Sequence, residues 1–175
     1  PRDSGSVYLD HAATSPLRRE VWSAMESVLG EAGANAASPH SPGQRAAALL
    51  EEARGRLADR LGAPRSDLVF TSGGTAADNL AVLGFALAHR EESPRLLVSA
   101  VEHKAVLGAA DRAAEGGAEV ATIPVDRHGV LELDALRGAL RSGTDVPTIV
   151  SVMWANNEVG TVQPLEEVTR IAHEH

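Results

Sequence analysis

The stretch Phe70-Thr71-Ser72-Gly73-Gly74-Thr75-Ala76-Ala77-Asp78-Asn79 decides how this chain folds. The apolar segment 68–70 before it predicts a strand, and a helix is expected from Thr75 because apolar residues recur at steps of four, three and four: Ala76, Leu80, Leu83 and Leu87. A glycine turn between a strand and a helix directs free backbone N–H groups and the positive end of the helix dipole at one spot. Glycine lacks a Cβ, so a ligand oxygen can approach the backbone closely. The stretch therefore predicts an anion site, most often for phosphate, and an ordinary helix-capping turn is the alternative.

Strands and helices alternate along the remaining sequence. Short apolar runs predict strands at 7–9, 96–98, 120–123 and 148–153. Helical spacing and capping residues predict helices at 21–29, 44–61, 104–115 and 133–140, and another opened by Pro164. This order is typical of an α/β fold with a mainly parallel sheet flanked by helices.

Composition narrows the possible functions. Of the 175 residues, 43% are hydrophobic and 23% charged, and the net charge is −8, which favours neither nucleic acid nor an anionic membrane as a partner. No apolar run approaches the roughly 18 residues of a membrane-spanning helix, and no signal-peptide pattern is present. Because the chain has no cysteine, we expect a cytoplasmic location and neither a cysteine nucleophile nor a thiolate metal site within it. We also expect no metal site at its histidines, since these have no metal-ligand spacing: His11, His89, His128, His173 and His175.

Three polar clusters each follow a predicted strand directly, at 72–75, 102–104 and 156–158. Ligands of open α/β sheets bind outside the carboxyl ends of the strands, so these clusters are expected to lie together and favour the phosphate interpretation. A nicotinamide-binding Rossmann domain is disfavoured because the G-x-G-x-x-G motif and its acidic partner are absent, and a P-loop because no Gly-Lys-Ser/Thr occurs.

With these segments in view, the chain resembles the cysteine desulfurases of the class V aminotransferase group, which are fold-type I pyridoxal-phosphate enzymes. The matching segments, in order and spacing, are 8–14, 35–40, 70–75, 78–79, 102–107 and 156–160. The chain departs from the family at Ala36, where proline is usual, and at Ala76-Ala77, where a pair such as Glu-Ser is usual. The resemblance implies that residues 17–175 form the first portion of the pyridoxal-phosphate-binding large domain. Residues 1–16 would be an N-terminal segment that packs with the small domain.

The resemblance also implies roles for single residues. The backbone of Gly74 and Thr75, with the Thr75 hydroxyl, would form part of a phosphate cup. His103 would stack on the pyridine ring and move protons, with helix capping as the alternative. Asn157 would bind near the phenolic oxygen of the cofactor and the substrate carboxylate, with a turn role as the alternative. Asn35 would line the substrate mouth, with turn chemistry as its alternative.

The function that the resemblance implies is removal of sulfur from L-cysteine, which gives alanine and an enzyme persulfide. A sulfur-acceptor protein would take this sulfur for iron–sulfur clusters, for other sulfur-containing cofactors or for nucleic acids. The family is homodimeric, and the helix at 44–61 with the loop before it would contribute near the dimer interface. The family's Schiff-base lysine, pyridine-binding aspartate and persulfide cysteine follow the part of the pattern seen here, so we expect a C-terminal polypeptide to complete the enzyme. The alternatives are a non-catalytic scaffold half-domain and a related enzyme, such as selenocysteine lyase or another class V aminotransferase.

Overall fold

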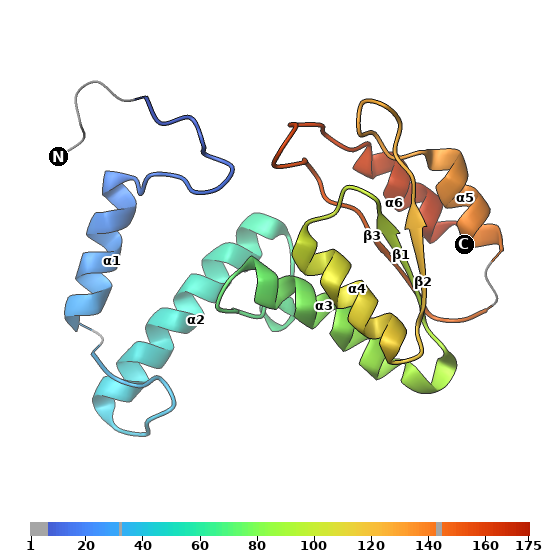
Figure 1. The fold of residues 1–175 in the computed structure, drawn as a ribbon. Coiled ribbons are helices and arrows are strands. Elements are labelled where there is room, and N and C mark those ends of the chain that lie inside the picture. The colour runs from blue at the N-terminus through green and yellow to red at the C-terminus, as the bar shows by residue number, and fades with distance from the viewer. Residues whose placement is uncertain (1–6, 32, 143–144) are drawn as a thin grey trace. The chain divides into compact units, whose positions relative to one another are not determined.

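The computed structural model describes residues 7–31, 33–142 and 145–175, and the chain divides into two compact units, Pro1–Phe70 and Thr71–His175 (Figure 1). The first unit holds α1 (Arg19–Glu31), α2 (Ser41–Leu61) and the 3₁₀ turn η1 (Arg65–Asp67). Both helices confirm the prediction, and α2 begins earlier than expected because Nδ1 of His40 accepts a hydrogen bond from the Gly43 N–H at 3.2 Å. Gly62 ends α2 in the left-handed conformation, at φ 65°.

The two strands predicted in the first unit are not formed. Val7 and Leu9 are each 81% exposed, and segment 68–70 is irregular although it is apolar. The Leu68 carbonyl accepts from the Arg54 guanidinium, which also lies 4.8 Å from the centre of the Phe70 ring. An apolar run becomes a strand only where another strand supplies backbone partners, and none of the described residues pairs with either segment.

The second unit contains a parallel sheet with the strand order β2-β1-β3. Its strands are β1 (Arg95–Ser99), β2 (Glu119–Ile123) and β3 (Thr148–Ser151), and Leu97 lies opposite Ala121 and Val150. The predicted fold class, a parallel sheet flanked by helices, is confirmed. Strand β3 is shorter than predicted, ending at Ser151 instead of Met153.

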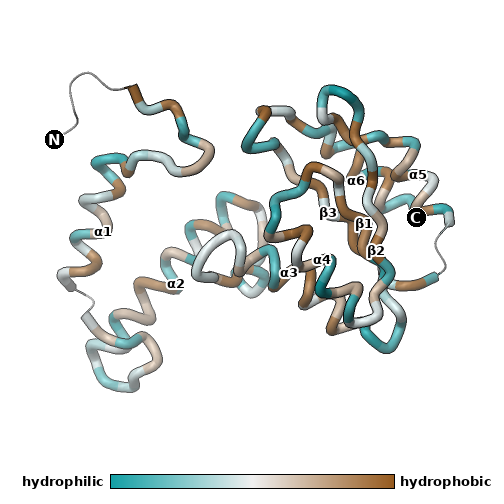
Figure 2. Tube along the Cα trace, in the orientation of Figure 1, coloured by the Kyte–Doolittle hydropathy of each residue, from teal (hydrophilic) through white to brown (hydrophobic). Residues whose placement is uncertain are grey.

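Helices cover both faces of this sheet (Figure 1). On one face α3 (Gly74–Ala88) and α4 (Lys104–Glu115) pack on Leu96 and Val98, whereas α5 (Leu133–Arg141) and α6 (Leu165–His173) enclose Leu97 on the other. These three strand side chains are at most 2% exposed, and the central strand lies in the apolar middle of the unit (Figure 2). Successive side chains of a strand point to opposite faces, so an unbroken apolar strand fits a sheet covered on both sides. Burying each such side chain stabilises the fold by about 1.5–3 kcal/mol.

The predicted apolar face of α3 is wrong in part. Leu80 and Leu87 are 54% and 65% exposed, while Val82 and Ala86 enter the core. Apolar residues of this helix lie both in the core and at the surface, so its periodicity does not define which side meets the sheet. The 3₁₀ turn η2 (Arg90–Glu92) follows this helix.

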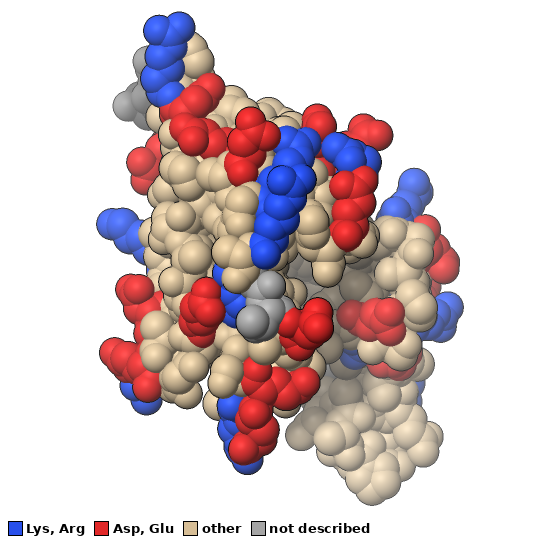
Figure 3. All heavy atoms as spheres, turned by 90° about the vertical axis from the view of Figure 1, so that its right-hand side faces the viewer, with Lys and Arg blue, Asp and Glu red and all other residues tan. Residues whose placement is uncertain are grey.

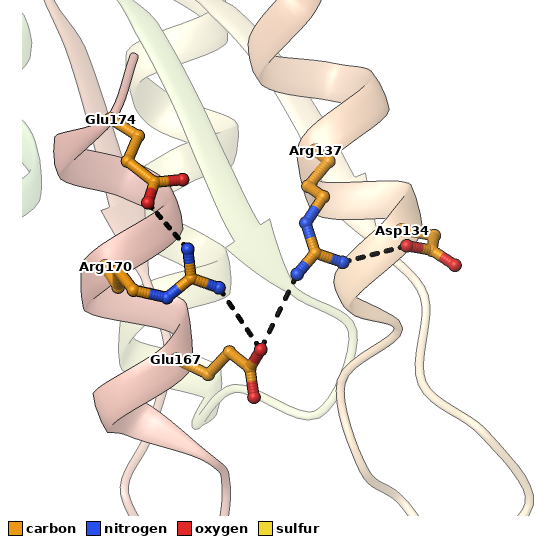
Figure 4. Close-up of polar contacts among 5 residues, drawn as sticks. All are labelled: Asp134, Arg137, Glu167, Arg170 and Glu174. Carbon is orange, nitrogen blue, oxygen red and sulfur yellow. Dashed lines mark hydrogen bonds and ion pairs between the residues drawn. The ribbon is translucent and has the colours of Figure 1, made fainter.

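Charged side chains join α5 to α6. The Glu167 carboxylate accepts from Arg170 at 3.2 Å and lies 3.6 Å from Arg137, which also binds Asp134 at 2.9 Å (Figure 4). Acidic and basic side chains alternate over this side of the molecule (Figure 3). Such exposed pairs contribute only about 0–1 kcal/mol each, so the apolar core dominates the packing of the two helices. Among the described residues, no helix combines the length and apolar character needed to cross a membrane.

Candidate functional site

The turn before α3 presents unpaired backbone donors. The first backbone hydrogen bond of the helix runs from the Ala77 N–H to the Gly73 carbonyl at 3.1 Å, and no side chain caps the helix at Gly73. The N–H groups of Gly74, Thr75 and Ala76 therefore have no acceptor within the helix. A Cβ placed on Gly73 or Gly74 would meet no atom within 4 Å, so the space over the turn is open. This turn has the donors and the room that an anion requires.

His103 begins the next helix. It is exposed, and its Nδ1 accepts a hydrogen bond from the Ala105 N–H at 3.1 Å, so the capping alternative is confirmed. In a neutral ring that accepts at Nδ1, the proton lies on Nε2. The cap thus leaves Nε2 available for a ligand, and stacking on a cofactor stays a prediction.

Two hydrogen bonds join the loop after β1 to the loop after β3. The Met153 N–H donates to the carboxylate of Glu102, and Nδ2 of Asn156 donates to the Val101 carbonyl at 3.2 Å. Because β1 and β3 are parallel neighbours, both loops leave the same edge of the sheet. The structure therefore brings the polar segments that contain His103 and Asn157 to one edge, as the sequence predicted.

Asn157 lies at the tip of a loop that Asn156 organises. Oδ1 of Asn156 accepts from the N–H groups of Glu158 and Val159 at 2.9 and 3.0 Å, and Gly160 turns the chain at φ 77°. Asn157 is exposed, and among the described residues its side chain makes no hydrogen bond, so its amide can serve a ligand.

The electrostatics of Glu102 connect this edge to α3. Burial raises the pKa of its carboxyl above the ordinary 4.5; the bond from Met153 lowers the pKa, the nearby charge of Asp78 raises it, and His103 lowers it. Asp78 belongs to the early part of α3, so the Glu102 carboxylate senses the glycine-turn helix as well as both loops. The carboxyl is thus held in a crowded, partly desolvated position.

Asn35 belongs to the first unit. Its Oδ1 accepts from the Ala37 N–H at 2.9 Å, which is the turn chemistry of the alternative interpretation, and its substrate role stays a prediction. In the parts of the chain that the structure describes, no group of three or more histidine, aspartate or glutamate side chains could hold a metal ion.

Sequence reasoning missed Gln163. This side chain is 3% exposed; it accepts from the Leu131 N–H at 2.9 Å and donates to the Gly129 carbonyl at 2.6 Å, fixing the far end of the Asn157 loop. No sequence pattern marks a lone glutamine for this role. The sequence does carry a signal for Glu102, because an acidic residue three positions after a buried strand is often partly buried and then needs a hydrogen-bond partner.

Comparison with known proteins agrees with this arrangement. The family described as aminotransferase class-V matches residues 7–175. The chain is 42% identical to the cysteine desulfurase IscS of Dictyoglomus turgidum, and the match covers 97% of this chain and 42% of the relative. It is 46% identical to the IscS-like cysteine desulfurase of Mycobacterium tuberculosis, and that match covers 96% of this chain and 43% of the relative. It therefore spans less than half the length of these relatives.

Solved structures show the same likeness. A NifS-like protein superimposes with a TM-score of 0.89 at 34% identity, covering 96% of this chain and 45% of that one. SspA in complex with cysteine gives a TM-score of 0.88 at 31% identity, covering 97% and 48%. On the family match and these likenesses, the chain belongs to the class-V aminotransferase family, among relatives named cysteine desulfurases.

Proposed function

We propose that this chain is the N-terminal part of a pyridoxal-phosphate-dependent cysteine desulfurase that acts in the cytoplasm as a homodimer. The enzyme takes sulfur from L-cysteine and passes it to a sulfur-acceptor protein. The observation that carries the proposal is the convergence of His103 and the Asn157 loop at one sheet edge, together with the open, uncapped turn that begins α3. The names of the relatives, and a structural neighbour described in complex with cysteine, support the substrate.

The residues present fit pyridoxal phosphate. The open turn at Gly74 and Thr75 offers unpaired N–H groups and a hydroxyl at a helix N-terminus, which suits the cofactor's phosphate. When bound, the cofactor withdraws electrons from the α carbon of an amino-acid substrate. The chain's own residues bind, orient and transfer protons around that chemistry.

His103 has the right constraints for a proton-transfer residue. The bond from the Ala105 N–H to Nδ1 fixes the neutral tautomer with the proton on Nε2, so the ring meets the substrate as a donor; it takes up a proton at Nδ1 only when the bond to Ala105 opens. The imidazole plane suits stacking against a flat, electron-poor ring. One ring therefore both caps α4 and serves the site.

Asn157 suits the recognition of oxyanions. An amide donates to a carboxylate or phenolate oxygen without adding charge, and the hydrogen bonds of Asn156 and Gln163 hold its loop in place. We assign Asn157 the contact to the substrate carboxylate and to the cofactor's phenolic oxygen.

The remaining groups belong to the rest of the protein in this proposal. The chain spans 42% of the curated relative from Dictyoglomus turgidum, and Lys104 is its sole lysine and cysteine is absent. Covalent attachment of the cofactor and uptake of sulfur as a persulfide require a lysine and a cysteine thiolate, respectively. We propose that a C-terminal polypeptide supplies both.

The complete protein that contains this chain tests the proposal. Purified with pyridoxal phosphate, it should bind the cofactor and release alanine from L-cysteine in the presence of a thiol reductant. Selenocysteine supplied in parallel separates a desulfurase from a selenocysteine lyase, since only the latter would reject cysteine. Failure to bind the cofactor would favour the non-catalytic scaffold, whereas cofactor binding without action on either substrate would favour another class V aminotransferase.

A further inference from the structure

The carboxylate of Glu102 is buried at the edge of the sheet where the candidate site forms, yet the proposed chemistry does not use it. We propose that Glu102 is a positioning residue, which joins the loop after β1 to the loop after β3 and thereby holds His103 and Asn157 in one site. This inference rests on the proposed function, because it deepens the description of the same site.

Hydrogen bonds hold both the backbone and the side chain of Glu102. Its backbone N–H donates to the Ser99 carbonyl at 3.2 Å, which holds it directly against the end of β1. Its side chain, in a residue only 8% exposed, accepts from the Met153 N–H 51 positions along the chain. One residue thus connects the ends of two neighbouring strands.

A hydrogen-bond acceptor is needed at this point because β3 has ended. Its pairing with β1 stops at Ser151, opposite Val98, so the half-buried Met153 N–H receives no acceptor from the sheet. Leaving such a donor unsatisfied costs about 1–3 kcal/mol. Glu102 supplies the acceptor and, in doing so, determines where the Asn157 loop leaves the sheet.

A second hydrogen bond also runs from the loop after β3 to the loop after β1. Nδ2 of Asn156 donates to the Val101 carbonyl, while the Val101 N–H donates to the Oγ of the fully buried Ser99 at 3.3 Å. The residues before His103 and before Asn157 are therefore each held by the opposite loop. Losing the Glu102 bond leaves the Asn156 bond as the remaining hydrogen bond between the two loops among the described residues.

The charges that face Glu102 are those of Asp78 on α3 and His103 beside it. The Asp78 carboxylate disfavours a buried charge at this place, and a protonated His103 would favour it. A glutamine would keep the acceptor oxygen and remove the charge. Glu102→Gln therefore tests the hydrogen bond separately from the electrostatics.

The experiment compares Glu102→Ala, Glu102→Gln and the wild type in the complete protein. Amide hydrogen exchange of peptides covering 152–160 reports the loop, circular dichroism in the cofactor band reports the site, and kcat and KM are measured with L-cysteine. We expect Glu102→Ala to speed exchange, change the cofactor band and lower kcat/KM roughly 10- to 100-fold, the size expected when a catalytic group is misplaced by about 1 Å. Glu102→Gln should restore all three readouts to near the wild type.

Arg95→Met is the matched control. Arg95 is 4% exposed at the other end of β1, where it donates to Glu119 at 2.9 Å and to the Ala139 carbonyl at 3.2 Å. Its loss should lower the melting temperature while leaving exchange in 152–160 and the cofactor band unchanged. If Glu102→Ala does not fold, Glu102→Asp replaces it, because a side chain one methylene shorter keeps the charge and is expected to lose the bond from the Met153 N–H.

Two results would overturn the inference: unchanged exchange in 152–160 after the Glu102 substitution, or faster exchange with an unchanged cofactor band and unchanged turnover. The exchange comparison needs no cofactor. A failure of the proposed function would appear as a wild-type protein that binds no pyridoxal phosphate. The exchange comparison still tests the Glu102 bond in that case.

Discussion

Nδ1 of His103 accepts a hydrogen bond from the Ala105 N–H at 3.1 Å, so the side chain proposed to serve the cofactor also caps the helix that follows it. The cap uses Nδ1 and leaves the Nε2–H to donate to a ligand, so the two roles coexist while the ring is neutral. They also separate experimentally, because asparagine is a good helix cap but has no ring and no comparable proton chemistry.

We predict that His103→Ala lowers the free energy of unfolding by about 0.5–2 kcal/mol, the usual loss for a helix cap, and sharply reduces turnover of L-cysteine. His103→Asn should recover most of the stability but not the turnover. Urea unfolding and alanine release in the complete protein measure the two effects. His89, which pairs with Glu92 at 2.8 Å away from the site loops, is the control, and His89→Ala should keep full turnover. Recovery of turnover in His103→Asn would contradict a role for the ring.

The glycine turn gives a prediction about the phosphate. We expect Thr75→Ala to weaken binding of pyridoxal phosphate about tenfold, equivalent to about 1.4 kcal/mol, because one hydrogen bond to a charged group is lost. Thr75→Ser should bind as the wild type does, since it keeps the hydroxyl. Titration with pyridoxal, which lacks the phosphate, is the control: its affinity should be the same in all three proteins. An equal loss for both compounds would place the phosphate elsewhere.

The raised pKa of Glu102 predicts how stability depends on pH. A carboxyl that binds its proton more tightly in the folded protein loses stability as pH rises from its ordinary pKa of 4.5 through the folded value, and the loss remains above that value. Glu102→Gln has no such ionisation. Its stability relative to the wild type should therefore increase between about pH 4 and about pH 7. Unfolding free energies at the two pH values test this, and a difference that is constant or decreases would show that burial does not dominate the ionisation.

The sequence predicted the sheet of the second unit because β1 and β2 are short apolar runs bounded by turn residues and helices. It also placed two of the three polar clusters, 102–104 and 156–158, at one edge, since the parallel neighbours β1 and β3 share their carboxyl ends; the cluster at 72–75 does not follow a strand. It could not tell that segment 68–70 would stay irregular, because strand formation depends on a partner remote in sequence. The buried side of α3 and the role of Gln163 also could not be predicted from the sequence, since both depend on which surfaces meet after folding.

The exposed apolar side of α3 predicts association. Leu80 and Leu87 are more than half exposed, as is Trp22 on α1, and large exposed apolar surface favours self-association. A polypeptide of these 175 residues expressed alone should therefore aggregate or form dimers, and Leu80→Glu with Leu87→Glu should reduce this. Light scattering during size-exclusion chromatography measures it, with exposed Glu115→Gln as the control. A monodisperse wild-type monomer with a sharp melting transition would contradict the prediction.

Lys104 is the only lysine of the chain and thus the obvious candidate for covalent attachment of pyridoxal phosphate, yet we predict that it does not bind the cofactor covalently. It is exposed at the first position of α4, directly after the capping His103. His103 precedes the helix in an extended conformation, at φ −62° and ψ 147°, and successive side chains along extended backbone point to roughly opposite sides, so a lysine next to a ring that faces the cofactor should point away from it. Lys104→Ala should leave the cofactor absorbance of the complete protein nearly unchanged, whereas His103→Ala should reduce turnover. Borohydride reduction followed by peptide mapping gives the direct answer, because a pyridoxyl group on Lys104 would require a different arrangement of the site.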